Sequence, residues 1–379
     1  MDLKEEALKY HAKHQGKIAT QVLTPIKNRA DLTLAYTPGV AEVSKVLVED
    51  PDKAYKYSIK AHTIAVITDG SAVLGLGNIG ALGALPVMEG KCAIFKSFAG
   101  IDAFPICLDT QDKDEIIKAV RQIAPVFGGI NLEDIGAPKC FDIENALQDL
   151  GIPVMHDDQH GTAVVVLAGL INAAKVAGKE MKSLKVVISG AGAAGTACAN
   201  LLDGLVDDII VIDSKGIISK RRNDLDSYKK KLLKFTNSKN ISGSLLDALI
   251  GADVFVGVSA PNILKAGDIE KMNQKAIVFA MANPTPEIMP DEAKKGGAFI
   301  TGTGRSDFPN QINNSLAFPG IFKGALQSRA KKITKEMELA AAYALANLVK
   351  NPTVDKIIPG PFDKGIVEDV SKAVKSTAN

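Results

Sequence analysis

The chain has 379 residues, which is too long for one ordinary hydrophobic core and fits two domains of comparable size. Hydrophobic residues make up 46% of it and charged residues 23%, as in soluble globular proteins, and a net charge of +2 provides no field that would attract nucleic acid or an acidic membrane. Four scattered cysteines argue against a disulfide framework and a thiolate zinc site.

At the N-terminus, the sequence MDLKEEALKYHAKHQGK predicts a highly charged first helix and lacks the apolar core of a signal peptide. The longest apolar stretch, TAVVVLAGL, is far shorter than the roughly 20 residues that span a bilayer. The unpaired cysteines indicate a reducing compartment. We therefore expect a cytoplasmic protein that acts on a small molecule and binds neither nucleic acid nor a membrane.

Residues 1–160 alternate short apolar runs with amphipathic stretches, which is typical of strands interleaved with helices. The predicted strands are residues 62–70, 103–110, 126–134 and 152–158. The predicted helices are residues 80–100, 114–125 and 140–151. We expect this part to form an N-terminal α/β domain.

Residues 161–379 begin with a long predicted helix and then repeat the alternation. The predicted strands are residues 184–190, 208–214, 252–259, 276–284 and 298–302. The predicted helices are residues 162–179, 334–349 and 363–376. We expect a Rossmann-like NAD(P)-binding domain whose final helices return to pack near the N-terminal domain, with the site in the cleft between the two domains.

A glycine-rich turn, SGAGAAG, follows a predicted strand and opens a helix. Gly190, Gly192 and Gly195 give the G-x-G-x-x-G pattern, in which a tight turn brings the backbone to a pyrophosphate at the helix N-terminus. Asp213 ends the next strand, where an acid can hold the adenine-ribose hydroxyls and so favour NAD. Ser214, Lys215, Arg221 and Arg222 follow, and they could accommodate NADP. The alternative is a turn that serves packing alone.

Two other stretches invite a binding interpretation that their surroundings do not support. The Lys-rich stretch from Lys220 to Lys234 is typical of a solvated helix face. Gly75, Gly77 and Gly80 do not open a second βαβ unit, and we interpret them as sites of close backbone packing beside the active site.

Two pairs of acids stand at the ends of neighbouring predicted strands, Glu133 with Asp134 and Asp157 with Asp158. Because the carboxyl ends of parallel strands share one edge of a sheet, the four carboxylates can converge on one crevice. Such a concentration of negative charge favours a bound cation, and oxygen ligands without thiolate favour magnesium or manganese. The alternative is that these acids only cap helices.

His156 and His160 are four positions apart, a spacing that zinc sites on helices use. The surrounding residues, HDDQHG, indicate a strand end followed by a turn, so one helical face would not present both rings. We therefore prefer the oxygen-ligand site.

Seven segments in this order resemble the malic enzymes, specifically the short microbial form, over nearly the whole chain. They are AYTPGVA, ITDGSAVLGLGNIGALGALPVMEGKCAIFKSFAGID, NLEDI, HDDQHGTA, the Rossmann turn, ANPTPE and NNSLAFPG. The resemblance implies oxidative decarboxylation of L-malate to pyruvate and carbon dioxide, with reduction of NAD (or NADP) and a requirement for Mg²⁺ or Mn²⁺.

The resemblance also implies a role for each matching residue. Tyr36 falls on the general acid, Lys91 on the general base and Asp157 on the acid that supports the lysine. The implied metal ligands are Glu133, Asp134 and Asp158. The implied substrate-binding residues are Asn283 and Asn314. Ser71 is a further candidate, because Ala72 stands where larger malic enzymes have an arginine. The residues expected to bind the cofactor are Gly190, Gly192, Ala193, Ala194, Gly195, Asp213, Ser214, Lys215, Ser259 and Asn283.

Chemistry is consistent with these roles. A lysine removes the hydroxyl proton of malate only if its pKa falls towards neutral, which burial or a nearby cation achieves.

The chain departs from the larger malic enzymes at Ala72. Those enzymes carry an arginine at this position of the DGS motif, which holds a malate carboxylate. The charged N-terminal helix, with Tyr36 shortly after it, suggests an arm that embraces a partner, so we expect a homodimer.

Two rival hypotheses remain open. An amino-acid dehydrogenase would use a lysine and a Rossmann domain but no metal, which leaves the acid pairs unexplained. A catalytically dead nucleotide sensor would bind cofactor without turnover, and it leaves the complete set of Tyr36, Lys91 and acids unexplained.

Overall fold

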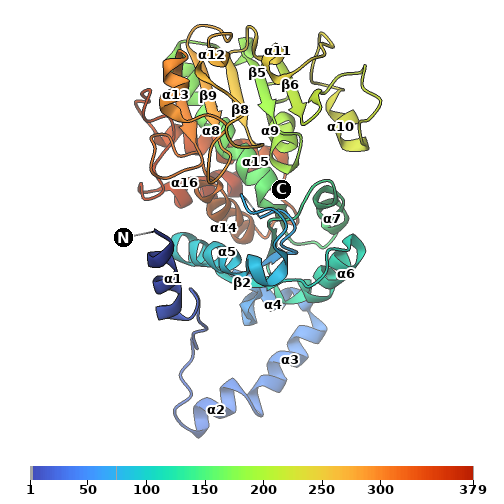
Figure 1. Ribbon diagram of the computed structural model, residues 1–379. Helices are drawn as coiled ribbons and strands as arrows, with labels where there is room; N and C mark the ends of the chain where they lie inside the picture. The colour runs from blue at the N-terminus through green and yellow to red at the C-terminus, as the bar shows by residue number, and fades with distance from the viewer. Residues whose placement is uncertain (1–2, 74, 379) are drawn as a thin grey trace.

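Two separate sheets form the centre of the molecule in this computed structural model, which describes residues 3–73 and 75–378 (Figure 1). The first sheet has the order β2-β1-β3-β4 and is parallel throughout. The second has the order β10-β9-β8-β5-β6-β7 and is parallel except for β7. The chain therefore has the two-domain α/β fold that the sequence predicts.

The strands match the apolar runs closely, because residues buried on both faces of a parallel sheet form continuous apolar segments. In the first sheet the strands are β1 (Thr63–Thr68), β2 (Asp102–Cys107), β3 (Gly129–Leu132) and β4 (Val154–His156). In the second sheet they are β5 (Lys185–Ser189), β6 (Asp208–Asp213), β7 (Gly216–Ile217), β8 (Val254–Gly257), β9 (Ala276–Ala280) and β10 (Ala298–Thr303).

Helix α8 (Asp157–Ala177) connects the two sheets and is the most deeply buried helix near the site. It begins at Asp157, directly after β4, so the expected turn at HDDQHG is wrong: Asp157, Asp158 and His160 lie in its first turn. Among the described residues it alone is long and apolar enough to cross a membrane, but 72% of its apolar window is buried inside the protein. It is a core helix.

The remaining helices of the two domains cover the sheets. Around the first sheet they are α5 (Gly80–Ile94), α6 (Lys113–Ile123) and α7 (Lys139–Leu147). Around the second they are α9 (Ala193–Leu202), α10 (Ser227–Leu232), α11 (Leu245–Leu249), α12 (Ala266–Ile269), α13 (Pro290–Lys295), α14 (Phe318–Ser328), α15 (Lys335–Leu348) and α16 (Ile366–Thr377). Helix α14 reaches the first domain, where Phe318 and Phe322 pack on Phe95. Of the predicted final helices, α15 lies near the same region, since its Glu338 pairs with His160.

The N-terminal segment forms an arm that contributes no buried residue to the core. It consists of α1 (Leu3–His14), α2 (Arg29–Ala35), α3 (Gly39–Glu49) and α4 (Ala54–Tyr57). Figure 1 shows α2 and α3 projecting away from both sheets. Apolar side chains on this arm are exposed, among them Leu32, Leu34, Tyr36, Val40 and Val48.

Candidate active site

A buried lysine lies at the centre of a group of acids between the two sheets. The Nζ atom of Lys91, on α5, lies 2.7 Å from an oxygen of Glu133 and 2.7 Å from an oxygen of Asp157. Its ammonium group also lies 4.3 Å from the ring centroid of Phe318, on α14. Only 8% of Lys91 is exposed. Such a dry setting strengthens each of these electrostatic contacts.

The carboxylates hold the proton on this lysine. Burial opposes the charge of Lys91, but Asp157 and Glu133 outweigh burial and raise its pKa above the ordinary value. Burial in turn raises the pKa of Glu133 and of Asp157, although Lys91 opposes both shifts. The expected fall of the lysine pKa is therefore not produced by these protein groups alone.

Three acids form a cluster that fits a hard metal ion. Oxygen atoms of Glu133, Asp134 and Asp158 lie within 4.8 Å of one another, and the donor set is entirely carboxylate. The backbone N–H of Asp134 donates to Asp158 at 2.8 Å, and Asp134 adopts a left-handed backbone with φ 53°. Burial raises the pKa of Asp158, although the charge of Lys91 opposes the shift. These residues fit Mg²⁺ or Mn²⁺.

His160 does not share a metal site with His156. Its two ring nitrogens lie 3.0 Å from Glu144 and 2.7 Å from Glu338, so both are engaged by carboxylates. Burial opposes protonation, but these two acids raise the pKa of His160. His156 is fully buried at the end of β4, and burial lowers its pKa to about 4. His160 instead links α7 to α15 beside the acid cluster.

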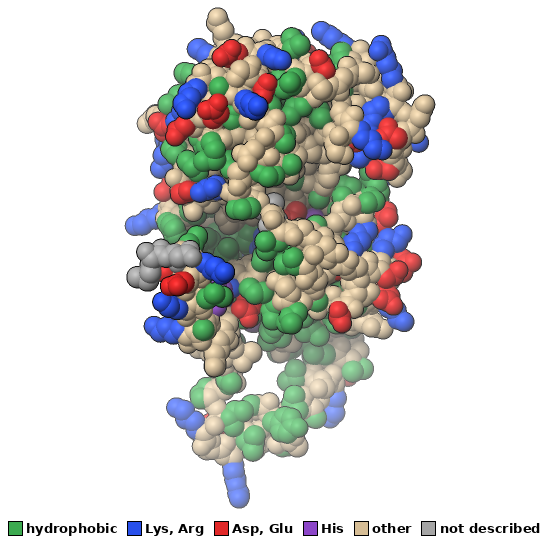
Figure 2. Space-filling model, in the orientation of Figure 1, with side chains coloured by type: hydrophobic (Ala, Val, Ile, Leu, Met, Phe, Trp, Pro, Cys, Tyr) green, Lys and Arg blue, Asp and Glu red, His purple; other side chains and the backbone are tan. Residues whose placement is uncertain are grey.

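The loops that follow the strands bring the remaining predicted substrate residues to the junction of the domains. An added Cβ at Gly75 would meet the carbonyl oxygen of Asn283 at 2.3 Å, so the loop after β9 packs directly on the first domain. An added Cβ at Gly161 would meet Asn314 at 3.2 Å and Asp157 at 1.9 Å, so these residues adjoin one another. Figure 2 shows a hollow between the two halves of the molecule in which acidic and histidine side chains are visible.

Ser71 lies in the loop after β1, next to the acid cluster. Its hydroxyl accepts from the backbone N–H of Gly136 at 2.9 Å, just beyond Asp134. The neighbouring carboxylate of Asp69 is buried and pairs with Lys139 at 2.5 Å.

A cavity of about 920 Å³ opens at the carboxyl ends of β5, β6 and β8. Its floor is the glycine-rich turn: Gly190 has φ 114°, and an added Cβ at Gly195 would meet the Gly190 carbonyl oxygen at 1.7 Å. Ala193 and Ala194 begin α9. Backbone N–H groups at a helix start with no side chain over them suit a pyrophosphate. Ser259 also lines the cavity, and its hydroxyl lies 3.0 Å from that of Ser189.

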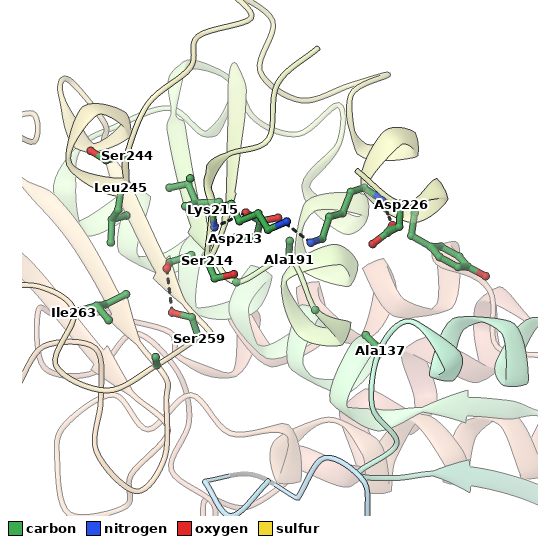
Figure 3. Close-up of a pocket in the computed structure, with 18 of the residues that line it drawn as sticks. Ala137, Ala191, Asp213, Ser214, Lys215, Asp226, Ser244, Leu245, Ser259 and Ile263 are labelled. Atoms are coloured by element: carbon green, nitrogen blue, oxygen red, sulfur yellow. Dashed lines mark hydrogen bonds and ion pairs between the residues drawn. The ribbon is translucent and has the colours of Figure 1, made fainter. Parts of the chain in front are cut away.

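Charged residues line the part of this cavity between the end of β6 and α10 (Figure 3). Asp213, Ser214 and Lys215 lie at the end of β6, and Tyr228 and Lys229 come from α10. Arg222 binds Asp213 through two nitrogens, at 2.7 and 3.0 Å, and Lys229 binds it at 2.8 Å. Burial opposes the ionised form, but these partners lower the pKa of Asp213 to about 2.

Family models match both halves of the chain. One described as the malic enzyme N-terminal domain matches residues 15–148, and one described as the malic enzyme NAD binding domain matches residues 159–377. The chain belongs to the malic enzyme family.

Individual malic enzymes are similar over most of their length. The Bacillus subtilis protein named bifunctional malic/malolactic enzyme is 54% identical over all of this chain and 93% of that protein. The Geobacillus stearothermophilus NAD-dependent malic enzyme is 55% identical over 96% of this chain and 77% of that protein. The crystal structure of the Thermotoga maritima NAD-dependent malic enzyme is 51% identical, with a TM-score of 0.95 over 98% of this chain and 99% of that one. Other relatives, at 45% identity, are named NADP-dependent malic enzymes.

One residue predicted from the malic enzyme motifs lies away from the others. Tyr36 follows the last residue of α2 on the arm and is 65% exposed. Figure 1 shows α2 at the far end of the arm, well separated from α5, which carries Lys91. The chain therefore does not bring its own Tyr36 to Lys91.

Sequence reasoning missed several side chains in this malic enzyme site. Phe318 lies inside NNSLAFPG, but nothing in that segment indicates a ring beneath a lysine. Glu338 is the one charged residue within the stretch MELAAAYAL of α15, and an acid in such an apolar stretch is a signal for a buried ion pair. The interpretation of the Lys220–Lys234 stretch as a solvated face is wrong at Arg222 and Lys229, which pair with Asp213.

Proposed function

We propose that this chain catalyses the oxidative decarboxylation of L-malate to pyruvate and carbon dioxide, with NAD, or NADP, as the hydride acceptor. The observation that carries the proposal is the buried Lys91 ammonium, which contacts Glu133 and Asp157 beside a cluster of three acids. The lysine can act as a base, and the acids beside it can hold a cation. The neighbouring cavity has room for a dinucleotide that accepts the hydride.

In this proposal Glu133, Asp134 and Asp158 hold the divalent cation. A cation held there would supply Lewis-acid chemistry, which would polarise a keto oxygen and favour the loss of carbon dioxide. Lys91 removes the hydroxyl proton of malate while hydride leaves for the nicotinamide. Asp157 orients Lys91 throughout.

Asn283 and Asn314 are the proposed carboxylate-binding residues, since both lie at the junction of the domains. Ser71 is the third. Its hydroxyl accepts from Gly136 and still has a proton to donate, which suits a site where Ala72 replaces an arginine.

Protonation of the enolate carbon is assigned to Tyr36, which must come from a second copy of the chain. The arm that carries Tyr36 buries none of its own residues and exposes Leu32, Leu34, Val40 and Val48. Figure 2 shows hydrophobic side chains gathered on the projecting arm. A homodimer that exchanges arms would bury this apolar surface and complete each site. We also propose that residues 1–160 form the N-terminal domain and residues 161–379 the NAD(P)-binding domain. We propose a cytoplasmic location for the protein.

The first test is the absorbance of reduced nicotinamide with L-malate and Mn²⁺, run with NAD and with NADP, each with and without a chelator. We expect reduction that requires the metal and yields one pyruvate per cofactor reduced. Lactate is measured in the same samples, because a relative is named a malic/malolactic enzyme. Cofactor binding without reduction of either cofactor would overturn the proposal in favour of a nucleotide sensor.

A further inference from the structure

The carboxylate of Asp213 has no acceptor position left for a ligand. A carboxylate offers about four lone-pair sites on its two oxygens. One oxygen accepts from Arg222 Nη1 and from the backbone N–H of Lys215, at 2.7 and 2.9 Å. The other accepts from Arg222 Nη2 and Lys229 Nζ, at 3.0 and 2.8 Å. All four sites are occupied by this chain's own donors.

An acid at this position ordinarily selects NAD in two ways. It accepts hydrogen bonds from the ribose hydroxyls, and its charge repels the 2′-phosphate of NADP. Because its lone pairs are occupied, Asp213 cannot accept hydrogen bonds from the ribose hydroxyls. Because Arg222 and Lys229 neutralise its charge, it repels a 2′-phosphate only weakly.

The ion-paired group around Asp213 has an excess of positive charge. Arg222 also binds Asp224 at 2.7 Å, and Lys215 Nζ lies 3.1 Å from the same acid. Three cations, Lys215, Arg222 and Lys229, therefore face two carboxylates. Asp226 also lines the cavity, but it accepts from the backbone N–H of Lys229 as the cap of α10, and Figure 3 shows it apart from Asp213.

The donors that a phosphate needs point to the same place. Ser214, Lys215 and Lys229 all line the cavity, whereas Arg222, which binds Asp213, is not among the lining residues. The side chains of Lys215 and Lys229 are 68% and 26% exposed, and each ammonium group has three N–H donors, so both can donate to a ligand while Lys229 keeps its contact with Asp213. Compact ammonium groups and a hydroxyl are suitable phosphate donors.

We propose that the adenine-ribose end of this cavity is a 2′-phosphate subsite, formed by Ser214, Lys215 and Lys229, so that the chain uses NADP as well as NAD. Arg222 is a positioning residue in this subsite, because it keeps Asp213 occupied and neutralised. The inference rests on the proposed function only in that the cavity binds a nicotinamide dinucleotide.

The test is calorimetric titration of the full-length protein with NADP⁺ and with NAD⁺, without malate or metal. We expect the two dissociation constants to lie within about tenfold of each other. Lys229→Ala should weaken NADP⁺ binding by about tenfold, the effect of losing one charge-assisted hydrogen bond, and leave NAD⁺ binding nearly unchanged. Lys230→Ala, which changes the exposed neighbour on α10, should alter neither.

Arg222→Gln provides a second readout that a purely structural role would not give. Once Asp213 is freed, NADP⁺ should bind less tightly while NAD⁺ binds equally or more tightly. Tight NAD⁺ binding without NADP⁺ binding would overturn the subsite, as would equal weakening of both cofactors by Lys229→Ala. These outcomes are separate from a failure of the proposed function, which is an absence of malate-dependent reduction in a protein that binds cofactor. Binding of neither cofactor would overturn both.

Discussion

The Nζ atom of Lys91 lies 2.7 Å from Oδ2 of Asp157, although the two residues are 66 positions apart in the chain. Lys91 comes from the last turn of α5, and Asp157 is the first residue of α8. The contact joins the first domain to the helix that leads into the second. It therefore depends on the correct packing of three elements, β4, α5 and α8.

Loss of the Asp157 charge should reduce turnover without unfolding the protein. In Asp157→Asn the lysine keeps its contact with Glu133 but loses one charged partner that orients it. We expect kcat to fall by about a hundredfold, as for the loss of a group that supports general base catalysis, with little change in NAD⁺ affinity. Steady-state kinetics and cofactor titration measure the two effects.

Asp102→Asn is the control, because Asp102, on the edge strand β2, forms an equally short contact with the exposed Lys96, at 2.7 Å. It should leave kcat within about twofold, since exposed ion pairs contribute little. Equal losses in the two variants would show that Asp157 has no special role.

Two glycines on α8 differ in what a methyl group would meet. At Gly161 an added Cβ would lie 1.9 Å from Oδ1 of Asp157, whereas at Gly169 the nearest atom is 3.5 Å away, on Phe279. Gly161→Ala should displace Asp157 and lower kcat by at least about tenfold, since a misplaced group loses its near-attack geometry. Gly169→Ala should retain activity and unfold at an equal or higher temperature, because alanine favours the helix. Full activity of Gly161→Ala would contradict this account of the site.

The sequence predicts most of the sheets and the convergence of the acids, because both follow from local rules. Buried parallel strands are continuous apolar runs, and their carboxyl ends share one edge, which places Glu133 near Asp157. The roles of these residues stay predictions. What the sequence could not provide depends on contacts distant in the chain: Phe318 beneath Lys91, and Arg222 on Asp213. A run of charged residues is predicted to face solvent when only its own sequence is considered. That Arg222 and Lys229 pair with Asp213 becomes evident only when the end of β6 is placed beside them.

The start of α8 illustrates the same limit. Polar residues such as HDDQH favour turns by local propensity, yet Asp157 and Asp158 are also suited to a helix N-terminus, where negative charge is stabilised. Tertiary packing of the long apolar segment that follows decides between the two. The helix therefore starts before the apolar run rather than within it.

Removal of one acid from the cluster should weaken metal binding more than it weakens the fold. We expect Asp158→Asn to reduce Mn²⁺ affinity by about tenfold or more, because one of three anionic ligands loses its charge. Electron paramagnetic resonance of free Mn²⁺ measures this without turnover. Saturating Mn²⁺ should also raise the melting temperature of the unaltered protein, since an ion that binds only the folded state stabilises it. Asp149→Asn, on the surface beside Arg121, should change neither result.

His160 should contribute strongly to stability through its two carboxylate partners. His160→Ala leaves Glu144 and Glu338, both nearly buried, without the cation between them. We expect the free energy of unfolding to fall by about 3 kcal/mol or more, as when one partner of a buried ion pair is removed. His62→Ala breaks an exposed pair with Asp102 and should cost less than about 1 kcal/mol. Urea denaturation of both variants compares the two, and similar losses would mean that His160 does not clamp α7 to α15.

Exchange of the N-terminal arms can be tested with two inactive variants. Tyr36→Phe lacks the proposed acid and Lys91→Ala lacks the proposed base, so each homodimer should be inactive or nearly so. A mixed dimer contains one site with both residues intact, because Lys91 of one chain meets Tyr36 of the other. Random mixing makes half of the dimers mixed, each with one of two sites intact, so activity should recover to about one quarter of the unaltered enzyme.

The mixture must be refolded or co-expressed so that arms can exchange, and the double variant mixed with the unaltered chain serves as a matched control. In that control the mixed dimer has no intact site if the two residues act across the dimer, so activity should fall from one half to about one quarter. If they act within one chain, each unaltered chain stays active and the control remains at one half. Co-purification of two differently tagged chains shows separately that mixed dimers have formed. Given mixed dimers, no recovery with the two single variants and a control at one half would mean that Tyr36 and Lys91 act within one chain, and the arm would have to fold back onto α5. A monomeric mass in solution would lead to the same conclusion, because no second chain would be present to supply Tyr36.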